Sequence, residues 1–215
     1  MPYRDRRDAG QQLAAELNAL SLERPVVFAL PRGGVPVGVE VARALHAPLE
    51  LLAVRKLGAP GNPELAVGAV AEDGSGVFDA RSAELLGMTP EMLDTAIAQE
   101  SRELLRRVQR YRSGRPPVDV KQRTAIVVDD GIATGMTELA AVRALRKSQA
   151  ATIVVAVPVG SEEALAMLRE EADRVICLRV PARLYGVGMW YEDFKPVSDD
   201  EVLALLAEAR AEQAL

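Results

Sequence analysis

The chain alternates between short apolar runs and longer segments in which apolar residues recur at helical spacing. Five short runs are rich in β-branched residues and almost continuously apolar, as parallel strands buried on both faces are. They occupy residues 25–31, 49–56, 124–130, 151–158 and 174–181. Between them lie segments with the period of amphipathic helices, residues 34–47, 89–112, 136–149 and 161–172. This alternation predicts right-handed βαβ crossovers and an α/β fold, with a doubly wound, mostly parallel sheet flanked by helices.

One segment departs from the alternation. Residues 57–78 carry many glycines and prolines around a short alternating run, which predicts a flexible loop or hairpin inserted after the second strand. The sequence contains no internal repeat and no low-complexity linker. Since 215 residues fit one domain with an elaboration, we expect a single domain over residues 1–215.

Composition narrows the functional classes. The formal net charge of -5 argues against binding to a nucleic-acid backbone, although a local basic pocket for a small polyanion remains compatible with it. Cys177 is the only cysteine, so no intrachain disulfide can form, which suits a reducing compartment. The first residues lack the apolar core of a signal peptide, and no apolar run approaches the roughly 18 residues of a membrane-spanning helix. We therefore expect a cytoplasmic protein with no membrane partner.

Two of the expected strands end in unusual residues, at the edge where open α/β sheets bind ligands. The stretch "LPRGGVPVG" joins the first strand to a helix. The stretch "IVVDDGIATGMTEL" places Asp129 and Asp130 at the end of the third strand. Because successive strand side chains point to opposite faces, both acids can line one site only if the strand ends there, and Gly131 supplies that ending.

The residues after the two acids predict an anion-binding turn. Glycines and the hydroxyls of Thr134 and Thr137 lead into a helix whose first N–H groups are unpaired. Carboxylates repel phosphate, so acids and turn belong together only if the ligand has an anionic end and also hydroxyls or a bound cation. A sugar phosphate has both. The Walker loop requires a lysine where Met136 stands, and the dinucleotide fingerprint is missing from this sequence.

Four apolar residues, two acids and "GIATGMT" resemble the phosphoribosyl diphosphate (PRPP) signature of type I phosphoribosyltransferases. The resemblance implies that Asp129 and Asp130 hold the ribose 2- and 3-hydroxyls. It also implies a 5-phosphate site built from backbone N–H groups and hydroxyls of Gly131, Ile132, Ala133, Thr134, Gly135, Met136 and Thr137. The plainer alternative is an ordinary strand-to-helix turn with capping acids and threonines.

The resemblance extends to the diphosphate end of the ligand. "LPRGG" is similar to the family's diphosphate loop, with Arg32 adding charge and Gly33 backbone N–H groups, and the family's cis peptide would fall at Arg32–Gly33. Arg55 and Lys56 resemble the Arg-Lys pair that precedes the flexible catalytic loop of several relatives. Simple turn chemistry and solvated charges are the plainer alternatives. Two acids of the following segment could also reach a substrate, namely Glu64 and Glu72.

The stretch "YGVGMWYEDFKPV" (185–197) concentrates aromatic residues in a chain that is only 4% aromatic. It distantly resembles the C-terminal part of the 6-oxopurine enzymes, which implies a hood over the base formed by about residues 182–215. Trp190, Tyr191 and Phe194 could stack on a planar base, or they could fasten the tail to the core. The sequence does not choose between these two roles.

The resemblance implies an enzyme of nucleotide salvage, a pentosyltransferase that transfers the phosphoribosyl group of PRPP to a nucleobase-like nitrogen acceptor and releases diphosphate. Asp129, Asp130, Arg32 and Lys56 would be its catalytic residues, and Mg²⁺ would be held mainly through PRPP, near the two acids. A PRPP-sensing regulator with little turnover is the main alternative, followed by an inert interaction module. Many relatives are dimers, which leaves room for a homodimer.

The acceptor is constrained by Ala133. Relatives that use hypoxanthine or guanine usually carry an aspartate at this position, which exchanges a proton with the purine, and alanine cannot do so. An acid from elsewhere, such as Glu64 or Asp193, could fill the gap. "DDGIATG" is closer to the adenine enzymes, but Met136 and the atypical loop and hood prevent the assignment of adenine. We therefore expect a protein that does not use hypoxanthine or guanine efficiently.

Overall fold

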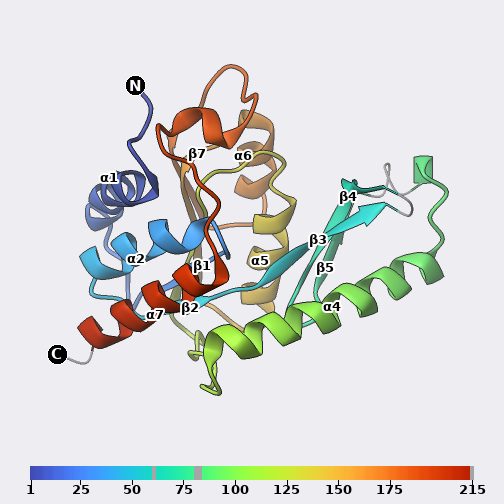
Figure 1. Cartoon of the computed structure of the whole chain (residues 1–215), viewed down its shortest axis with the longest axis horizontal. Helices are drawn as coiled ribbons and strands as arrows, with labels where there is room; N and C mark the ends of the chain where they lie inside the picture. The colour runs from blue at the N-terminus through green and yellow to red at the C-terminus, as the bar shows by residue number, and fades with distance from the viewer. Residues whose placement is uncertain (60–61, 80–83, 214–215) are drawn as a thin grey trace.

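The computed structural model describes residues 1–59, 62–79 and 84–213 and has a parallel sheet at its centre (Figure 1). The sheet has five strands in the order β2-β1-β6-β7-β8, and every neighbouring pair is parallel. The strands are β1 (Val26–Ala29), β2 (Leu49–Leu51), β6 (Thr124–Val128), β7 (Thr152–Val159) and β8 (Arg174–Arg179). The predicted α/β fold, a mostly parallel sheet flanked by helices, is confirmed.

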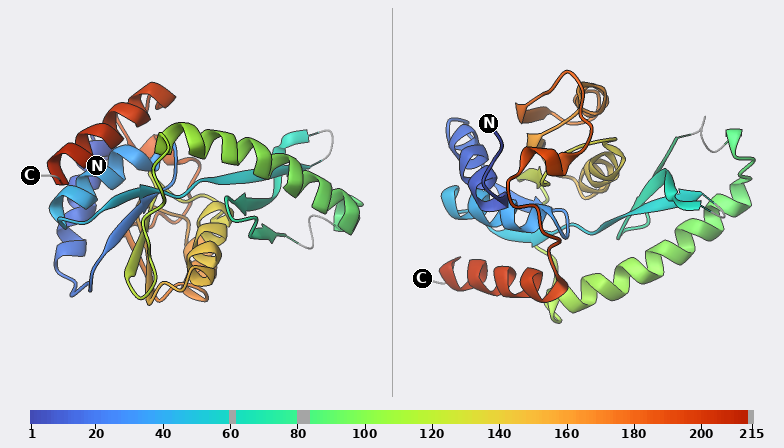
Figure 2. Two further views of the ribbon diagram at one scale, coloured as in Figure 1. Left: turned by 90° about the horizontal axis from the view of Figure 1, so that it is seen from below. Right: turned by 45° about the horizontal axis from the view of Figure 1, so that its top comes forward.

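Helices cover both faces of this sheet (Figure 2). One face is covered by α1 (Arg6–Asn18), α2 (Gly34–Ala44) and α7 (Asp199–Gln213), and the other by α5 (Met136–Lys147) and α6 (Glu162–Arg169). Alternate residues of β1 serve the two layers, since Val27 packs with the first group and Phe28 with the second. Strands buried on both faces explain the continuous apolar runs in the sequence.

The prediction of a single second strand is wrong. Residues 49–56 divide into β2 and β3 (Val54–Ala59), which belong to different sheets because the chain leaves the central sheet at Leu52. β3 pairs antiparallel with β4 (Asn62–Ala71), and β4 pairs with β5 (Gly76–Phe78). The segment that we predicted as a loop or hairpin, residues 57–78, thus contributes most of a three-stranded antiparallel sheet.

The small sheet and helix α4 (Pro90–Arg112) form an arm that projects from the central sheet (Figure 2). We use "arm" for the described residues 54–59, 62–79 and 84–112. Between the small sheet and α4 lies a small apolar cluster built on Leu57, Val67, Val70 and Met88. Near its base the arm also packs on α5, through residues such as Ala69 and Val77.

The sequence analysis missed the first and last helices. α1 begins where the Asp5 side chain accepts a hydrogen bond from Asp8 N, and it buries Leu13 and Leu17 in an otherwise polar segment. α7 lies within the predicted hood of about 182–215, but it packs on α2 instead, so only the part before it can act as a hood. Within the described ranges, none of the helices combines the length and apolar character needed to cross a membrane.

We expect the arm to exchange its amide hydrogens faster than β6 and β7, because its apolar cluster is small while those strands are enclosed on both faces. Leu57→Ala should destabilise the arm by ~2–5 kcal/mol and speed its exchange, with β6 and β7 still protected. Leu13→Ala, in the main core, should instead lower protection in the central sheet. Mass spectrometry of exchanged peptides measures both, and equal exchange in arm and sheet would contradict the expectation.

Candidate active site

Two turns meet at the carboxyl ends of β1 and β6. β6 ends at Val128, so Asp129 and Asp130 lie beyond the strand, as the sequence requires if both are to face one site. A Cβ on Gly33 would overlap with Oδ2 of Asp130, and a Cβ on Gly34 would lie 2.6 Å from the carbonyl oxygen of Val128. The turn that was predicted to hold diphosphate therefore touches the acid pair at positions where only glycine fits.

The cis peptide of this turn lies at Pro31–Arg32, so our placement at Arg32–Gly33 is wrong by one bond. The chain reverses earlier than the sequence suggested. Leu30 N still donates to the carbonyl oxygen of Val128 at 2.9 Å, and Gly33 already has helical dihedral angles (φ -62°, ψ -36°) as the N-cap of α2. The reversal is thereby confined to Pro31 and Arg32.

Asp130 is held from outside the sheet by Arg6, which the sequence analysis did not single out. Arg6 Nε donates to Asp130 Oδ2 at 2.8 Å, and the two side chains are only 10% and 14% exposed. Burial raises the pKa of Asp130, and the positive charge of Arg6 opposes that rise. On the main chain, the Tyr191 hydroxyl donates to the carbonyl oxygen of Asp130 at 2.5 Å.

Asp129 is paired with a second acid, Glu138 in the first turn of α5. Glu138 is buried and Asp129 is half-buried, so the two carboxyl groups interact in surroundings that disfavour charge on either of them. Burial, together with the negative charges of Asp130 and Glu138, raises the pKa of Asp129 well above its ordinary value. Burial also raises the pKa of Glu138 to about 7. Sequence reasoning read Glu138 as a helix residue, because its partner becomes visible only after folding.

The turn after the acids leads into the N-terminus of α5. Gly135 adopts φ +78°, and a Cβ there would lie 2.8 Å from Met167 Cε, which explains the glycine. Ala133 and Thr134 are exposed. Ile132, in contrast, is buried, and its N–H donates to the carbonyl oxygen of Val159 at 2.9 Å. Of the residues predicted to bind phosphate through their N–H groups, Ile132 already uses its own in the protein.

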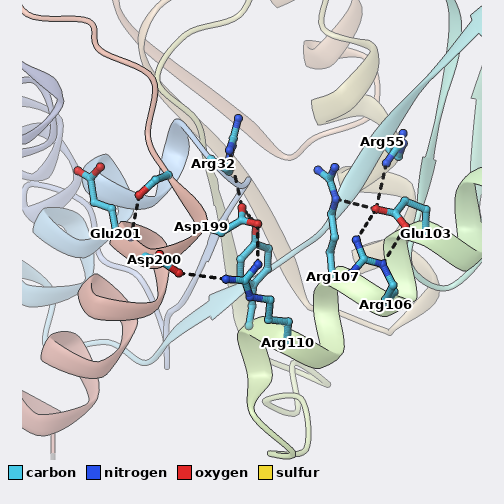
Figure 3. Close-up of polar contacts among 11 residues, drawn as sticks. Arg32, Arg55, Glu103, Arg106, Arg107, Arg110, Asp199, Asp200 and Glu201 are labelled. Atoms are coloured by element: carbon cyan, nitrogen blue, oxygen red, sulfur yellow. Dashed lines mark hydrogen bonds and ion pairs between the residues drawn. The ribbon is translucent and has the colours of Figure 1, made fainter.

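The predicted diphosphate cations differ in their surroundings (Figure 3). Arg32 is 48% exposed and its Nη1 lies 3.8 Å from Asp199 Oδ1, a loose ion pair at the start of α7. Asp199 is engaged more closely elsewhere, since it accepts from the Tyr111 hydroxyl at 2.6 Å and from Arg110 Nη1 at 3.1 Å. The Arg32 side chain is thus weakly restrained at the mouth of the turn.

Arg55 and Lys56 lie on opposite sides of β3. Arg55 forms an ion pair with Glu100 of α4. It also lies 3.8 Å from Glu103, on the arm side (Figure 3). Lys56 is exposed, and its charge lowers the pKa of Glu138, which places it toward the acid pair. Strand alternation thus brings Lys56 and not Arg55 toward the two acids.

The hood candidates fasten the tail to the core in this structure. Tyr191 is buried, and its ring stacks on Phe194 at 5.0 Å and lies 5.5 Å from Tyr3. A short 3₁₀ helix, η1 (Val187–Trp190), covers Gly131, where a Cβ would lie 2.6 Å from Val187 Cγ1. These contacts explain the aromatic cluster structurally, and the predicted stacking on a base remains untested.

The three acids considered for contact with the substrate, of which Glu64 and Asp193 were also candidates to replace the acid missing at Ala133, are placed as follows. Glu72 is bound by Arg112 Nη2 at 2.7 Å at the base of the arm. Asp193 is exposed and accepts from Lys195 Nζ at 2.8 Å. Glu64 belongs to β4, but its side chain lies outside the described residues.

A cavity of about 890 Å³ opens beside the turn that follows the two acids. Its walls come from Ala133 and Thr134, from residues 161–164 and 167, and from the segment 180–185 after β8. Among the described residues, the aromatic side chain in this lining is Tyr185, which is 78% exposed, and not one of the predicted hood residues. Tyr185 is the first residue of the aromatic stretch in the sequence, and its exposure in the structure distinguishes it from the buried Tyr191 of the same stretch.

Residues 4–191 match the family model described as the phosphoribosyl transferase domain, which contains both turns and the segment that covers them. The chain belongs to this family. Its phosphoribosyltransferase domain is 45% identical over 207 residues to the Mycobacterium tuberculosis H37Rv protein named "Putative phosphoribosyl transferase Rv0571c". That alignment covers 96% of this chain and 47% of the relative, so the chain spans about half the length of the curated relatives it matches.

Solved structures agree with the architecture of the phosphoribosyltransferase domain. TT1426 from Thermus thermophilus is 44% identical, with a TM-score of 0.83 and coverage of 97% of this chain and 99% of that one. AQ2163 from Aquifex aeolicus, at 14% identity, has a TM-score of 0.53 with coverage of 85% and 78%. The second likeness concerns the fold alone.

The raised pKa of Glu138 predicts a pH-dependent stability of the domain. Between the ordinary glutamate pKa of about 4.3 and the folded value of about 7, the folded state holds a proton that the unfolded state has lost. Stability therefore falls as pH rises through this window. Glu138→Gln should reduce that slope, to which Asp129 and Asp130 also contribute, so its melting temperature should exceed that of the wild type more at about pH 8 than at about pH 5.

Thermal melts of the ligand-free domain across this pH range measure the effect. Glu162→Gln is the matched control, because Glu162 also lies in the first turn of a helix but is exposed. Parallel wild-type and Glu138→Gln profiles would contradict the raised pKa of Glu138.

Proposed function

We propose that this chain binds PRPP with Mg²⁺ and transfers the phosphoribosyl group to a nucleobase-like nitrogen acceptor. The observation that carries the proposal is the contact between the two turns, in which Gly33 and Gly34 bring a cationic loop against Asp129 and Asp130. A ligand with a phosphate, vicinal hydroxyls and a diphosphate needs three features side by side: an anion-binding turn, acceptors for the hydroxyls and a cationic loop. Membership of the phosphoribosyl transferase family supports the same class of ligand.

In this proposal each part of PRPP has its own residues. Asp129 and Asp130 accept hydrogen bonds from the ribose hydroxyls. The 5-phosphate lies at the N-terminus of α5, where free N–H groups and the exposed Thr134 hydroxyl meet it. Ile132 does not bind the phosphate through its N–H in this proposal, because that N–H is already paired with the carbonyl oxygen of Val159; Ile132 anchors the turn to β7 instead.

The diphosphate lies in the turn after β1, with Arg32 and Lys56 as its cations. Arg32 can reach it by giving up a 3.8 Å contact to Asp199. Arg55 would first have to leave Glu100, so we assign it a secondary role. The donor set next to the turn, two carboxylates, suits Mg²⁺, and PRPP would supply most of its oxygen ligands. When bound, Mg²⁺ neutralises charge on the departing diphosphate.

The reaction is a displacement at C1 of the ribose. The acceptor nitrogen forms the new bond to C1 as the bond to the diphosphate oxygen breaks, with inversion and positive charge developing on the ribose ring. Asp129 and Asp130 fix the ring near that charge, while Arg32 and Lys56 stabilise the leaving group. In this proposal the arm, whose strand β3 carries Lys56, closes toward the site and limits the access of water.

We place the acceptor in the cavity beside Ala133 and Thr134. Tyr185 offers an exposed aromatic face for a planar acceptor, and Arg183 and Glu163 add polar groups of both signs to the wall. Of the two roles left open for Trp190, Tyr191 and Phe194, we assign them the fastening of the tail, since those rings pack on one another or on the N-terminal segment.

Asp129→Asn with Asp130→Asn should weaken PRPP binding at least tenfold, since each charged hydrogen bond contributes about 1.5–3 kcal/mol. Calorimetry with PRPP and Mg²⁺ measures this. Glu91→Gln with Asp94→Asn, an exposed pair on α4, is the control for removing the same charge. Unchanged PRPP affinity in the first variant would overturn the ribose assignment. PRPP binding without release of diphosphate, with any acceptor tested, would favour the regulatory alternative.

Ala133 predicts which acceptors fail. With hypoxanthine or guanine we expect turnover to be lower by about 10²–10⁴-fold than an enzyme with a general acid or base at this position would give. A panel of hypoxanthine, guanine, xanthine, adenine, uracil and orotate, assayed by diphosphate release, tests this, with Ala133→Asp as the variant that restores a carboxyl group. Robust conversion of either of the first two bases by the wild type would show that Ala133 does not limit the acceptor.

A further inference from the structure

Arg6 joins three parts of the molecule that are distant in sequence. Its Nε donates to Asp130 Oδ2 at 2.8 Å, and its Nη1 donates to the carbonyl oxygen of Lys195 at 2.9 Å. Its guanidinium carbon lies 3.9 Å from the centroid of Phe194 and 6.0 Å from that of Tyr191. The side chain therefore has a carboxylate, a carbonyl and an aromatic face as neighbours, which together match a planar cation.

The position of Arg6 is unfavourable for the helix that carries it. Arg6 is the first residue of α1, where the positive end of the helix dipole disfavours a cation. Burial of a guanidinium is also costly unless it is paired and fully hydrogen-bonded. Anchoring α1 does not require Arg6, because Leu13 and Leu17 bury that helix and the neighbouring Arg7 pairs with Glu40 of α2 at 3.1 Å. The compensating contacts of Arg6 all lie at the candidate active site or in the segment 187–195 that covers it, which we call the cover.

The same N-terminal segment holds the cover in place. Tyr3 N donates to the carbonyl oxygen of Trp190 at 2.7 Å, and Glu192 N donates to that of Tyr3 at 2.8 Å. Asp130 is consequently fixed at two atoms, at its side chain by Arg6 and at its carbonyl oxygen by Tyr191. The Oδ2 atom also lies against the backbone at Gly33, so the carboxylate has little freedom to turn.

We propose that Arg6 is a positioning residue for ribose recognition: it orients the Asp130 carboxylate and balances its charge, so that Asp130 can accept from a ribose hydroxyl beside an anionic ligand. This inference rests on the proposed function. Without Arg6, the Asp130 carboxylate loses the partner that orients it and no longer presents an oxygen to the ribose hydroxyl. The prediction is specific to ligands with ribose hydroxyls, because the hydrogen bonds and ring contacts of Arg6 in the described residues go to Asp130, Lys195, Tyr191 and Phe194 and not to the turn at α5.

The experiment compares two probes that share a phosphate but differ in hydroxyls. Ribose 5-phosphate uses both the phosphate turn and the acids, whereas ethyl phosphate uses the phosphate turn alone. The dissociation constant of ethyl phosphate divided by that of ribose 5-phosphate, both measured by calorimetry, reports the contribution of the hydroxyls. We expect Arg6→Gln to reduce this ratio about tenfold or more, as loss of an oriented, charge-assisted hydrogen bond does, with the dissociation constant of ethyl phosphate within about twofold of the wild type.

Two further variants separate positioning from folding. Arg7→Gln removes the same charge one residue away and should leave the ratio unchanged. Arg6→Lys keeps a charge without the planar fork and should recover part of the ratio. An unchanged ratio in Arg6→Gln overturns the inference and leaves the proposed function standing. A wild-type ratio near one overturns both, because the acids then do not recognise ribose. Equal weakening of both probes assigns Arg6 a purely structural role and also overturns the inference.

Discussion

The close approach of the turn after β1 to the acid pair after β6 is the constraint on which the site depends. β1 and β6 are neighbours in the central sheet, so their carboxyl ends meet, but ordinary side chains would keep the two turns apart. Gly33 and Gly34 remove that obstacle, and the main chain of one turn then lies against Asp130 and Val128 of the other. The arrangement of the acids, the start of α2 and the entry to α5 all follow from this contact.

The close contact creates an electrostatic problem that the surroundings resolve. Two adjacent carboxylates in a buried turn repel one another and any anion that approaches. Arg6 compensates Asp130 with an opposite charge, while burial and the neighbouring carboxyl groups raise the pKa of Asp129, and burial raises that of Glu138. The pair of acids is thus far less negative than the sequence alone suggests, and an acidic protein can offer a site for a phosphorylated ligand.

Sequence reasoning succeeded where the physics is local. Continuous β-branched runs revealed the central strands, and the order of strand, acids, glycine and threonines located the turn at α5. Sequence reasoning failed where contacts between residues far apart in the sequence determine the structure. Leu52 and Ala53 carry no signal that the chain changes sheets there. Arg6 and Asp130 are 124 residues apart, and Glu138 looks like any helix residue until Asp129 is packed beside it. The few apolar residues of α1 were too sparse to reveal a helix.

The cover over the acid turn contains the only tryptophan of the chain, Trp190, whose carbonyl oxygen is bound by the main chain of Tyr3. Tryptophan emission is sensitive to the polarity around the indole ring, so the protein carries a natural optical reporter at the junction of its N-terminal segment and its cover. The tryptophan fluorescence of the protein comes from this one place. Opening of the cover is therefore visible in the unlabelled wild-type protein, without confusion from the arm or the central sheet.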